Sequence, residues 1–362
     1  MATRVQGLPE TAGVGVVGVG VRGQHSYEVW LAPRPDCRIV AVAQQPDPST
    51  VMLEGKDPVG CAREWAARFG AEFMDDWREL VARPDVHLIS LMADPLTAPL
   101  VTEEVARAGK PMIRDKYLAA DLDGARQAVQ ACEAASVEML VTYNVRYLPA
   151  VQHLLAELRG GTIGRPLTAS FVYLVSGGPL AGFRATAEYA RRVGGGELTC
   201  FGVYALDVVL EVFGAPPERV SASQGALFYD DYAEAGLEDL SQVTLRFADG
   251  ALAHVLTGRT TTRPHPDCYF HLDVMGERGT LRALGPEPRH RCFAGETAAL
   301  PWQGSWGVTA MVDDFLSCLR SGRPSPIPAR RGYEVLQIVK AAYLSAREGR
   351  AVGLAEADSA GF

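Results

Sequence analysis

Lysine is scarce in this chain. Of the 35 lysines and arginines only four are lysines: Lys56, Lys110, Lys116 and Lys340. The formal net charge is −8, and the sequence contains no run of basic residues. Because nucleic acids and anionic membranes are bound by clustered positive charge, we expect neither as a partner.

Long apolar runs and paired cysteines are also missing. The most apolar stretch, CFGVYALDVVLEVFGA, is interrupted by Asp207 and Glu211, and the first residues lack the apolar core of a signal peptide. The seven cysteines are scattered, with no C-x-x-C pair. This usage is typical of reduced thiols, so we expect a cytoplasmic protein without a metal site.

What is present predicts two domains, because 362 residues exceed one ordinary core. We expect the first over 1–145. Apolar runs that resemble strands alternate there with amphipathic helical segments, and Asp121 is placed to cap one of the helices. Continuous apolar strands between helices indicate a doubly wound parallel sheet. The expected strands are 13–20, 37–43, 86–93, 110–115 and 137–143.

The second domain, expected over 146–362, is predicted to be α+β. Its strand-like runs are 166–176, 240–250, 251–262 and 269–284, and its expected helices are 147–161, 197–213, 306–321 and 331–349. Asp249 and Gly250 lie between two alternating runs, which is a hairpin signal. We therefore expect an open, mostly antiparallel sheet, with the last helices returning toward the first domain.

A glycine pattern follows the first strand. Gly18-x-Gly20-x-x-Gly23 precedes a helical segment, and in that context it predicts a turn that holds the pyrophosphate of NAD or NADP. Val19, Val21 and Arg22 belong to the same turn. Gln44 stands where an NAD-binding unit usually has an acidic residue, and it would not repel a 2′-phosphate. The choice between the two cofactors stays open.

The segment AGKPMIRDKYLAAD resembles the glucose–fructose oxidoreductase, inositol dehydrogenase and rhizopine-catabolism family (Gfo/Idh/MocA). The likeness extends through VTYNVRYLPAVQHLLAELRGGTIGRPL, GGGELTCFGVYALDVVLEVFG and the C-terminal segment. It implies a Rossmann domain and a second domain whose sheet often joins copies into a homodimer or homotetramer. It also implies hydride transfer to or from a secondary alcohol or ketone of a sugar, cyclitol or glycoside.

The resemblance also implies the roles of site residues. Lys116 matches the lysine that relays the substrate's proton, and Tyr204 takes the place of a second catalytic residue, a histidine. Since free lysine has a pKa of about 10.4, a lysine base needs burial or a nearby cation. We expect Ala93, Asp115 and Asn144 to join Lys116, Gln44 and the glycine turn at the cofactor. The expected substrate residues are Arg146, Tyr173, Arg184, Cys200 and Tyr204.

Several residues depart from the family pattern. Asp115 and Tyr117 flank Lys116 in place of glutamate and proline, and Cys200 replaces an aspartate. These departures keep an alternative open, namely a catalytically degenerate dinucleotide-binding sensor or partner-binding protein of the same fold. A third possibility is a tightly held cofactor that is cycled internally.

Overall fold

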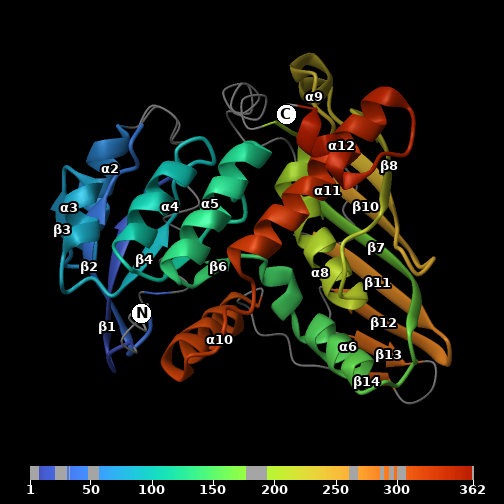
Figure 1. The fold of residues 1–362 in the computed structure, drawn as a ribbon, viewed down its shortest axis with the longest axis horizontal. Coiled ribbons are helices and arrows are strands. Elements are labelled where there is room, and N and C mark those ends of the chain that lie inside the picture. The colour runs from blue at the N-terminus through green and yellow to red at the C-terminus, as the bar shows by residue number, and fades with distance from the viewer. Residues whose placement is uncertain are drawn as a thin grey trace. The chain divides into compact units, whose positions relative to one another are not determined.

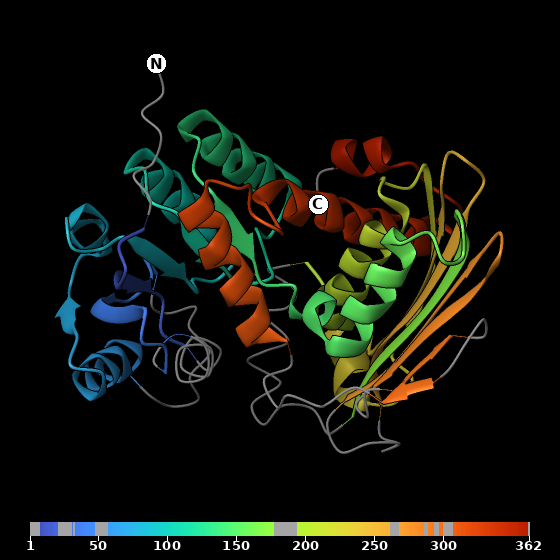
Figure 2. The same cartoon turned by 90° about the horizontal axis from the view of Figure 1, so that it is seen from below.

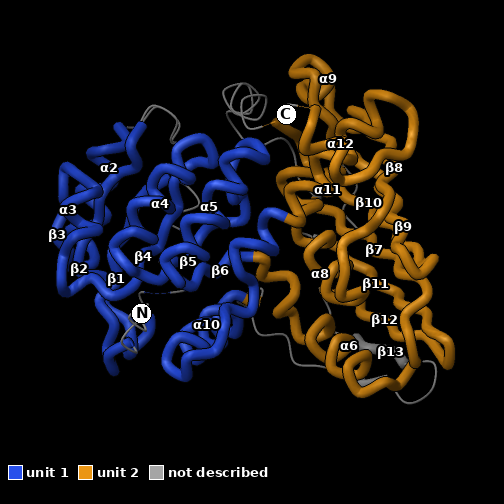
Figure 3. Tube along the Cα trace, in the orientation of Figure 1, with its two compact units in different colours: residues 1–142, 308–333 blue, residues 143–307, 334–362 orange. Residues whose placement is uncertain are grey.

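The computed structural model describes residues 8–20, 31, 33–47, 57–176, 194–260, 268–285, 289–292, 297–299 and 307–360. The chain forms two compact units, coloured separately in Figure 3. The first comprises Met1–Thr142 and Val308–Tyr333, and the second Tyr143–Gly307 and Glu334–Phe362. The expected domain boundary at residue 145 stays a prediction. The compact units differ from it by assigning 308–333 to the first unit.

The first unit contains a parallel sheet in the strand order β3-β2-β1-β4-β5-β6. The strands are β1 (Ala12–Val17), β2 (Cys37–Ala43), β3 (Glu72–Met74), β4 (Leu88–Leu91), β5 (Met112–Arg114) and β6 (Met139–Val141). All residues of β1, β4, β5 and β6 are buried, as expected for parallel strands covered on both faces. The doubly wound prediction is confirmed, although the short edge strand β3 had not been predicted.

The described residues of the first unit form the helices α2 (Pro58–Arg68), α3 (Trp77–Ala82), α4 (Ala98–Arg107), α5 (Leu122–Ala135) and α10 (Val308–Ser321). Asp57, Asp76 and Asp121 accept hydrogen bonds from free amides in the first turns of α2, α3 and α5. The cap predicted at Asp121 is confirmed. Figure 1 shows α4 and α5 side by side over one face of the sheet.

The second unit contains a mixed sheet in the order β14-β13-β12-β11-β7-β10-β9-β8. The strands are β7 (Pro166–Ser176), β8 (Arg219–Gly225), β9 (Leu240–Arg246), β10 (Leu252–Thr260), β11 (Cys268–Gly276), β12 (Gly279–Gly285), β13 (Arg289–Cys292) and β14 (Thr297–Ala299). Among the strand pairs of the described residues, β7 and β10 are parallel and the others are antiparallel, which confirms the predicted sheet. The turn at Asp249 and Gly250 joins β9 to β10 as predicted.

Helices cover one face of this sheet, as Figure 2 shows for α6, α8 and α11. The helices are η2 (Asn144–Tyr147), α6 (Pro149–Arg159), η3 (Leu198–Gly202), α8 (Val203–Phe213), α9 (Asp230–Ala235), α11 (Ala329–Glu348) and α12 (Leu354–Ser359). Ala169, Phe171 and Tyr173 alternate along β7 and are all buried, as expected for the face under the helices. Within the described residues, no helix combines the length and the apolar character that crossing a membrane requires.

The helix expected over 197–213 is not regular. It begins as a π-helix, η3, and continues as α8. π-helical turns are rare and occur often at functional sites. This irregular start carries Cys200, and Tyr204 follows in the first turn of α8.

Candidate active site

The glycine turn lies at the carboxyl end of β1, whose neighbours are β2 on one side and β4 on the other. At this point the strand order reverses, which is where doubly wound sheets bind nucleotides. Gly18 has a φ of +93°, and a Cβ there would lie 2.7 Å from the amide nitrogen of Ala93. Glycine is therefore required at position 18 for both backbone conformation and space. Val21, Arg22 and Gly23 lie outside the described residues.

Gln44 follows β2, and its side chain is bound to the glycine turn. Its Oε1 accepts from the amide of Val19 at 2.9 Å, and its Nε2 donates to the carbonyl of Val19 at 3.0 Å. The Nε2 also donates to the carbonyl of Pro58, and Oε1 accepts from the amide of Gln45. The side-chain amide of Gln44 thus holds the glycine turn in place through these hydrogen bonds. Its contact with the cofactor ribose stays a prediction.

A second polar link joins the ends of β2 and β4, and the sequence reading missed it. The amide of Asp94 donates to Oε1 of Gln45 at 2.9 Å, and Nε2 of Gln45 donates to the carboxylate of Asp94. Asp94 also accepts from the amides of Leu96 and Thr97. Gln45 and Asp94 are both buried, so this link fixes the loop after β4 that contains Ala93.

Lys116 lies in a turn directly after β5, and its neighbours hold that turn. Oδ1 of Asp115 accepts from the amide of Lys116 at 2.8 Å and from the hydroxyl of Thr142 at 3.2 Å. The guanidinium of Arg114, which is buried, donates to the carbonyl of Tyr117. β5 pairs with β4, and β4 pairs with β1, all in parallel. Lys116 and the glycine turn therefore follow the carboxyl ends of strands in the same sheet.

The ammonium of Lys116 is buried and meets a phenol. Lys116 is 1% exposed, its Nζ donates to the hydroxyl of Tyr117 at 3.1 Å, and it lies 4.3 Å from the centre of that ring. A cation over an aromatic face is stabilised by the negative face of the ring. Tyr117, a departure from the family pattern, is therefore a direct partner of the predicted catalytic lysine.

In the second unit, Tyr204 packs among aromatic rings. Its ring centre lies 6.3 Å from that of Tyr143 and 6.1 Å from that of Tyr173, both in edge-on geometry. The ring centre of Phe201 lies 6.4 Å from that of Tyr173. The structure thus brings together two of the predicted substrate residues, Tyr173 and Tyr204, while Cys200 is partly exposed in η3.

Three other predicted residues belong to the second unit. Asn144 begins η2, and Arg184 lies outside the described residues. Arg146 is buried, and its guanidinium binds Asp207, with Nε 2.9 Å from Oδ2. It also lies 3.2 Å from Oε2 of Glu211. Burial alone would lower the pKa of Arg146, but these carboxylates outweigh it and raise the pKa. A substrate role for Arg146 stays a prediction.

A buried ionic cluster at the start of η3 was also missed. Nε of Arg259 lies 3.0 Å from Oε1 of Glu197, and the hydroxyl of Tyr232 donates to the same oxygen. The guanidinium of Arg259 also lies 5.4 Å from the ring centre of Phe201. Burial and the charge of Glu197 raise the pKa of Tyr232, so its phenol stays protonated. The triple glycine beside Glu197 was a visible signal for this segment, but nothing local pointed to Arg259.

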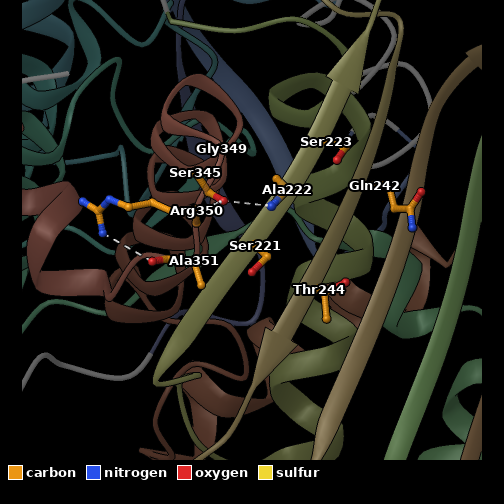
Figure 4. Close-up of a pocket in the computed structure, with 9 residues that line it drawn as sticks. All are labelled: Ser221, Ala222, Ser223, Gln242, Thr244, Ser345, Gly349, Arg350 and Ala351. Carbon is orange, nitrogen blue, oxygen red and sulfur yellow. Dashed lines mark hydrogen bonds between the residues drawn. The ribbon is translucent and has the colours of Figure 1, made fainter.

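The described residues contain no group of three or more histidine, cysteine or acidic side chains that could hold a metal ion. A cavity of about 280 Å³ lies in the second unit, between β8, β9 and the end of α11, and Figure 4 shows the residues that line it. None of the residues that line it was predicted as a site residue: Ser221, Ala222, Ser223, Gln242, Thr244, Ser345, Gly349, Arg350 and Ala351.

The first unit fits a nicotinamide dinucleotide. Gly18 leaves the backbone of the turn without a side chain at the point where the strand order reverses. The end of β2 carries amides at Gln44 and Gln45, so no carboxylate precedes Asp47 there to repel a 2′-phosphate. Both NAD and NADP are compatible with this arrangement.

Comparisons with known proteins agree with this reading. Residues 12–143 match the oxidoreductase family with an NAD-binding Rossmann fold, and residues 151–282 match the GFO/IDH/MocA C-terminal domain. The chain is 28% identical to a D-apiose dehydrogenase of Paraburkholderia graminis over 79% of this chain and 78% of that protein. It is 26% identical to an inositol 2-dehydrogenase of Acidothermus cellulolyticus over 94% of each.

Among solved structures, a probable dehydrogenase from Thermotoga maritima has the same fold, with a TM-score of 0.78 at 20% identity over 95% of this chain and 99% of that one. The two matching domains, the glycine turn at the point of strand reversal and the lysine after β5 lead to one conclusion. The chain belongs to the Gfo/Idh/MocA family of oxidoreductases.

Proposed function

We propose that this protein is an NAD(P)-dependent oxidoreductase that transfers a hydride to or from a secondary alcohol or ketone of a sugar, cyclitol or glycoside. One observation carries the proposal. A buried lysine, Lys116, follows β5 in the same sheet whose β1 leads into the glycine turn. Relatives named for D-apiose and inositol support the class of substrate.

Lys116 is the proposed proton relay. The nicotinamide, when bound, takes the hydride from the carbinol carbon or returns it. In the oxidation direction the hydroxyl proton must leave as the carbonyl forms, and the neutral amine of Lys116 accepts it. In the reduction direction the ammonium donates that proton. Tyr204 assists through its phenol, and Tyr173 and Cys200 belong to the substrate side.

We also propose that copies of the chain join through the second unit's sheet into a homodimer or homotetramer. On the face opposite the helices, Leu252, Thr168 and Met275 form a row across β10, β7 and β11. Leu252 is 47% exposed and Met275 48%. Covering these side chains with a second copy would remove apolar surface from water. Sedimentation of a Leu252→Glu, Met275→Glu variant should then give a smaller species than the wild type.

The functional test is turnover. Purified protein is incubated with NAD or NADP and a panel of sugars and cyclitols that includes D-apiose and inositol, and nicotinamide reduction is followed by absorbance. We expect reduction with at least one substrate and its loss in Lys116→Ala. Lys110→Ala is the matched control, because Lys110 precedes β5 at its other end and donates to the carbonyl of Arg83.

The outcomes separate the open alternatives. Binding of nucleotide without turnover of any compound would favour the degenerate sensor. A nucleotide that copurifies with the protein, and that is oxidised and reduced without exchanging with free nucleotide, would favour internal redox cycling. Equal turnover by wild type and Lys116→Ala would refute the role of Lys116. For localisation we propose the cytoplasm, on the basis of the scattered cysteines.

A further inference from the structure

The first turn of the helix that carries Cys200 and Tyr204 is held by residues far away in the sequence. No side chain at its N-terminal end caps η3. Helices leave their first amides without partners inside the helix, and a buried helix end needs partners from elsewhere. Here those partners are Glu238, just before β9, and Tyr343 of α11.

Glu238 and Tyr343 bind three consecutive amides. Oε1 of Glu238 accepts from the amide of Leu198 at 3.0 Å, and its main-chain carbonyl accepts from the amide of Glu197 at 3.2 Å. The hydroxyl of Tyr343 accepts from the amide of Gly196 at 3.0 Å and donates to Oε1 of Glu238 at 2.7 Å. The pair therefore replaces the missing cap.

The packing around this pair also accounts for two glycines of the triple. A Cβ on Gly196 would lie 2.4 Å from the carbonyl oxygen of Glu238 and 2.6 Å from its Oε2. A Cβ on Gly195 would lie 2.4 Å from the hydroxyl of Tyr343 and 2.0 Å from that of Thr199. The glycines therefore let the chain approach Glu238 and Tyr343 closely.

Tyr343 is itself held in place, because α11 is attached to the sheet nearby. The hydroxyl of Ser345 accepts from the amide of Ala222 in β8 at 3.0 Å and donates to the carbonyl of Arg350 at 2.6 Å. Figure 4 shows the bond between Ser345 and Ala222. The cap is thus connected to the rigid sheet from one side through α11 and from the other through β9.

Glu238 titrates in an unusual range. Burial raises its pKa from 4.5 to about 7, although hydrogen bonds from Tyr343 and Leu198 oppose the shift; the charge of Glu197 adds to it. Glu238 is contacted by Tyr343 of α11 and feels the charge of Glu197, while the hydroxyl of Thr199 bonds to that of Tyr343. Burial and the charge of Glu238 raise the pKa of Tyr343 well above its usual value, so the phenol stays protonated.

We propose that Glu238 is a positioning residue: together with Tyr343 it fixes the first turn of η3 and so determines where Tyr204 lies in the reaction. The proposal rests on the proposed function, in which Tyr204 acts on the substrate. Oε1 of Glu238 accepts both bonds in the neutral and in the ionised form, but the ionised form is more stable in water than at this buried position. The first turn is therefore held best near pH 4.5 and progressively less firmly as the pH rises to about 7.

Two substitutions separate the hydrogen bonds from the charge. Glu238→Ala removes the acceptor, while Glu238→Gln keeps an Oε1 and imitates the neutral acid at every pH. Glu356→Gln is the control, because Glu356 caps α12, a different helix, through the amide of Gly353. Each variant is studied by hydrogen exchange of the amides of Gly196 and Leu198, by NADH titration and by turnover of the panel.

We expect Glu238→Ala to speed exchange of both amides by about tenfold, to leave NADH affinity unchanged and to lower kcat about tenfold. Glu238→Gln should resemble the wild type at pH 5 and should exchange these amides more slowly than the wild type at pH 8. If Glu238→Ala does not fold, Tyr343→Phe tests the same bonds and should speed exchange of Gly196.

If Glu238→Ala has the wild-type rates of amide exchange and turnover, the proposal is overturned. The same holds for Tyr343→Phe if that variant has to be used instead. A ratio of exchange rates between wild type and Glu238→Gln that does not vary with pH would overturn the role of the charge. If these amides exchange faster in Glu238→Ala but the wild type turns over no compound, Glu238 does fix the first turn of η3, and it is the proposed function that is contradicted.

Discussion

The buried ion pair between Arg146 and Asp207 gives the sharpest test of how the second unit is held together. The side chain of Arg146 is 6% exposed and that of Asp207 is not exposed at all. Removing one partner of such a pair leaves a buried charge and costs about 3–5 kcal/mol, whereas replacing both with apolar residues is often nearly neutral.

The structure predicts an order for the variants. Arg146→Met leaves the fully buried Asp207 without its guanidinium, and we expect a loss of about 4 kcal/mol in the free energy of unfolding. Asp207→Val leaves Arg146 with Glu211, whose Oε2 lies 3.2 Å from Nη1, so the loss should be about 3 kcal/mol. Glu211 keeps Arg159 as a partner at 3.3 Å in either variant.

The assay is urea denaturation followed by circular dichroism on the wild type, both single variants and the double variant. We expect the double variant to unfold within about 1–2 kcal/mol of the wild type, so that the two substitutions are strongly coupled. Losses below about 1 kcal/mol that add in the double variant would refute the reasoning. Turnover by the double variant also decides the predicted substrate role of Arg146, since a substrate-binding arginine cannot be replaced by methionine without loss.

Three further predictions concern the cofactor turn, the lysine and Glu238. Gly18→Ala should destabilise the protein by about 1–3 kcal/mol in thermal unfolding and weaken NADH binding, because its Cβ would meet the backbone at Ala93; wild-type values for both would contradict the close approach. Tyr117→Phe should lower kcat several-fold with little change in KM, because it removes the hydrogen bond at 3.1 Å to Lys116 and keeps the ring; an unchanged kcat would exclude that bond from the reaction. The pKa of Glu238 is raised from 4.5 to about 7, so the folded protein binds the proton more tightly and stability should fall by about 3 kcal/mol between those pH values. Glu238→Gln should lack that fall in urea denaturation at pH 5 and pH 8, and identical pH profiles for the two proteins would show that Glu238 does not titrate there.

The architecture was predictable because its signals are local. Continuous apolar runs between amphipathic segments indicated the parallel sheet, Asp121 was recognised as a helix cap, and Asp249 with Gly250 marked a hairpin. Each of these three signals lies in residues that are close together in the sequence. The edge strand Glu72–Met74 was missed because it has three residues and is not fully buried.

The site was less predictable because its contacts join distant residues. Gln44 was recognised as an amide after a strand, but the sequence does not say whether such an amide binds a ribose or the turn beside it. Glu238 caps an amide 40 residues away, and Tyr343 bonds to it from 105 residues away. The π-helical start of the helix before Tyr204 was not predicted, because the sequence pattern over 197–213 indicated a regular helix.

The central claim is that this chain binds a nicotinamide dinucleotide at the glycine turn and uses it for hydride transfer. A fluorescence titration of the purified protein with NADH and NADPH in parallel tests it most directly. We predict saturable binding of at least one of the two, and the ratio of their affinities decides the cofactor. If neither binds, and the denatured protein releases no nucleotide, the claim is contradicted.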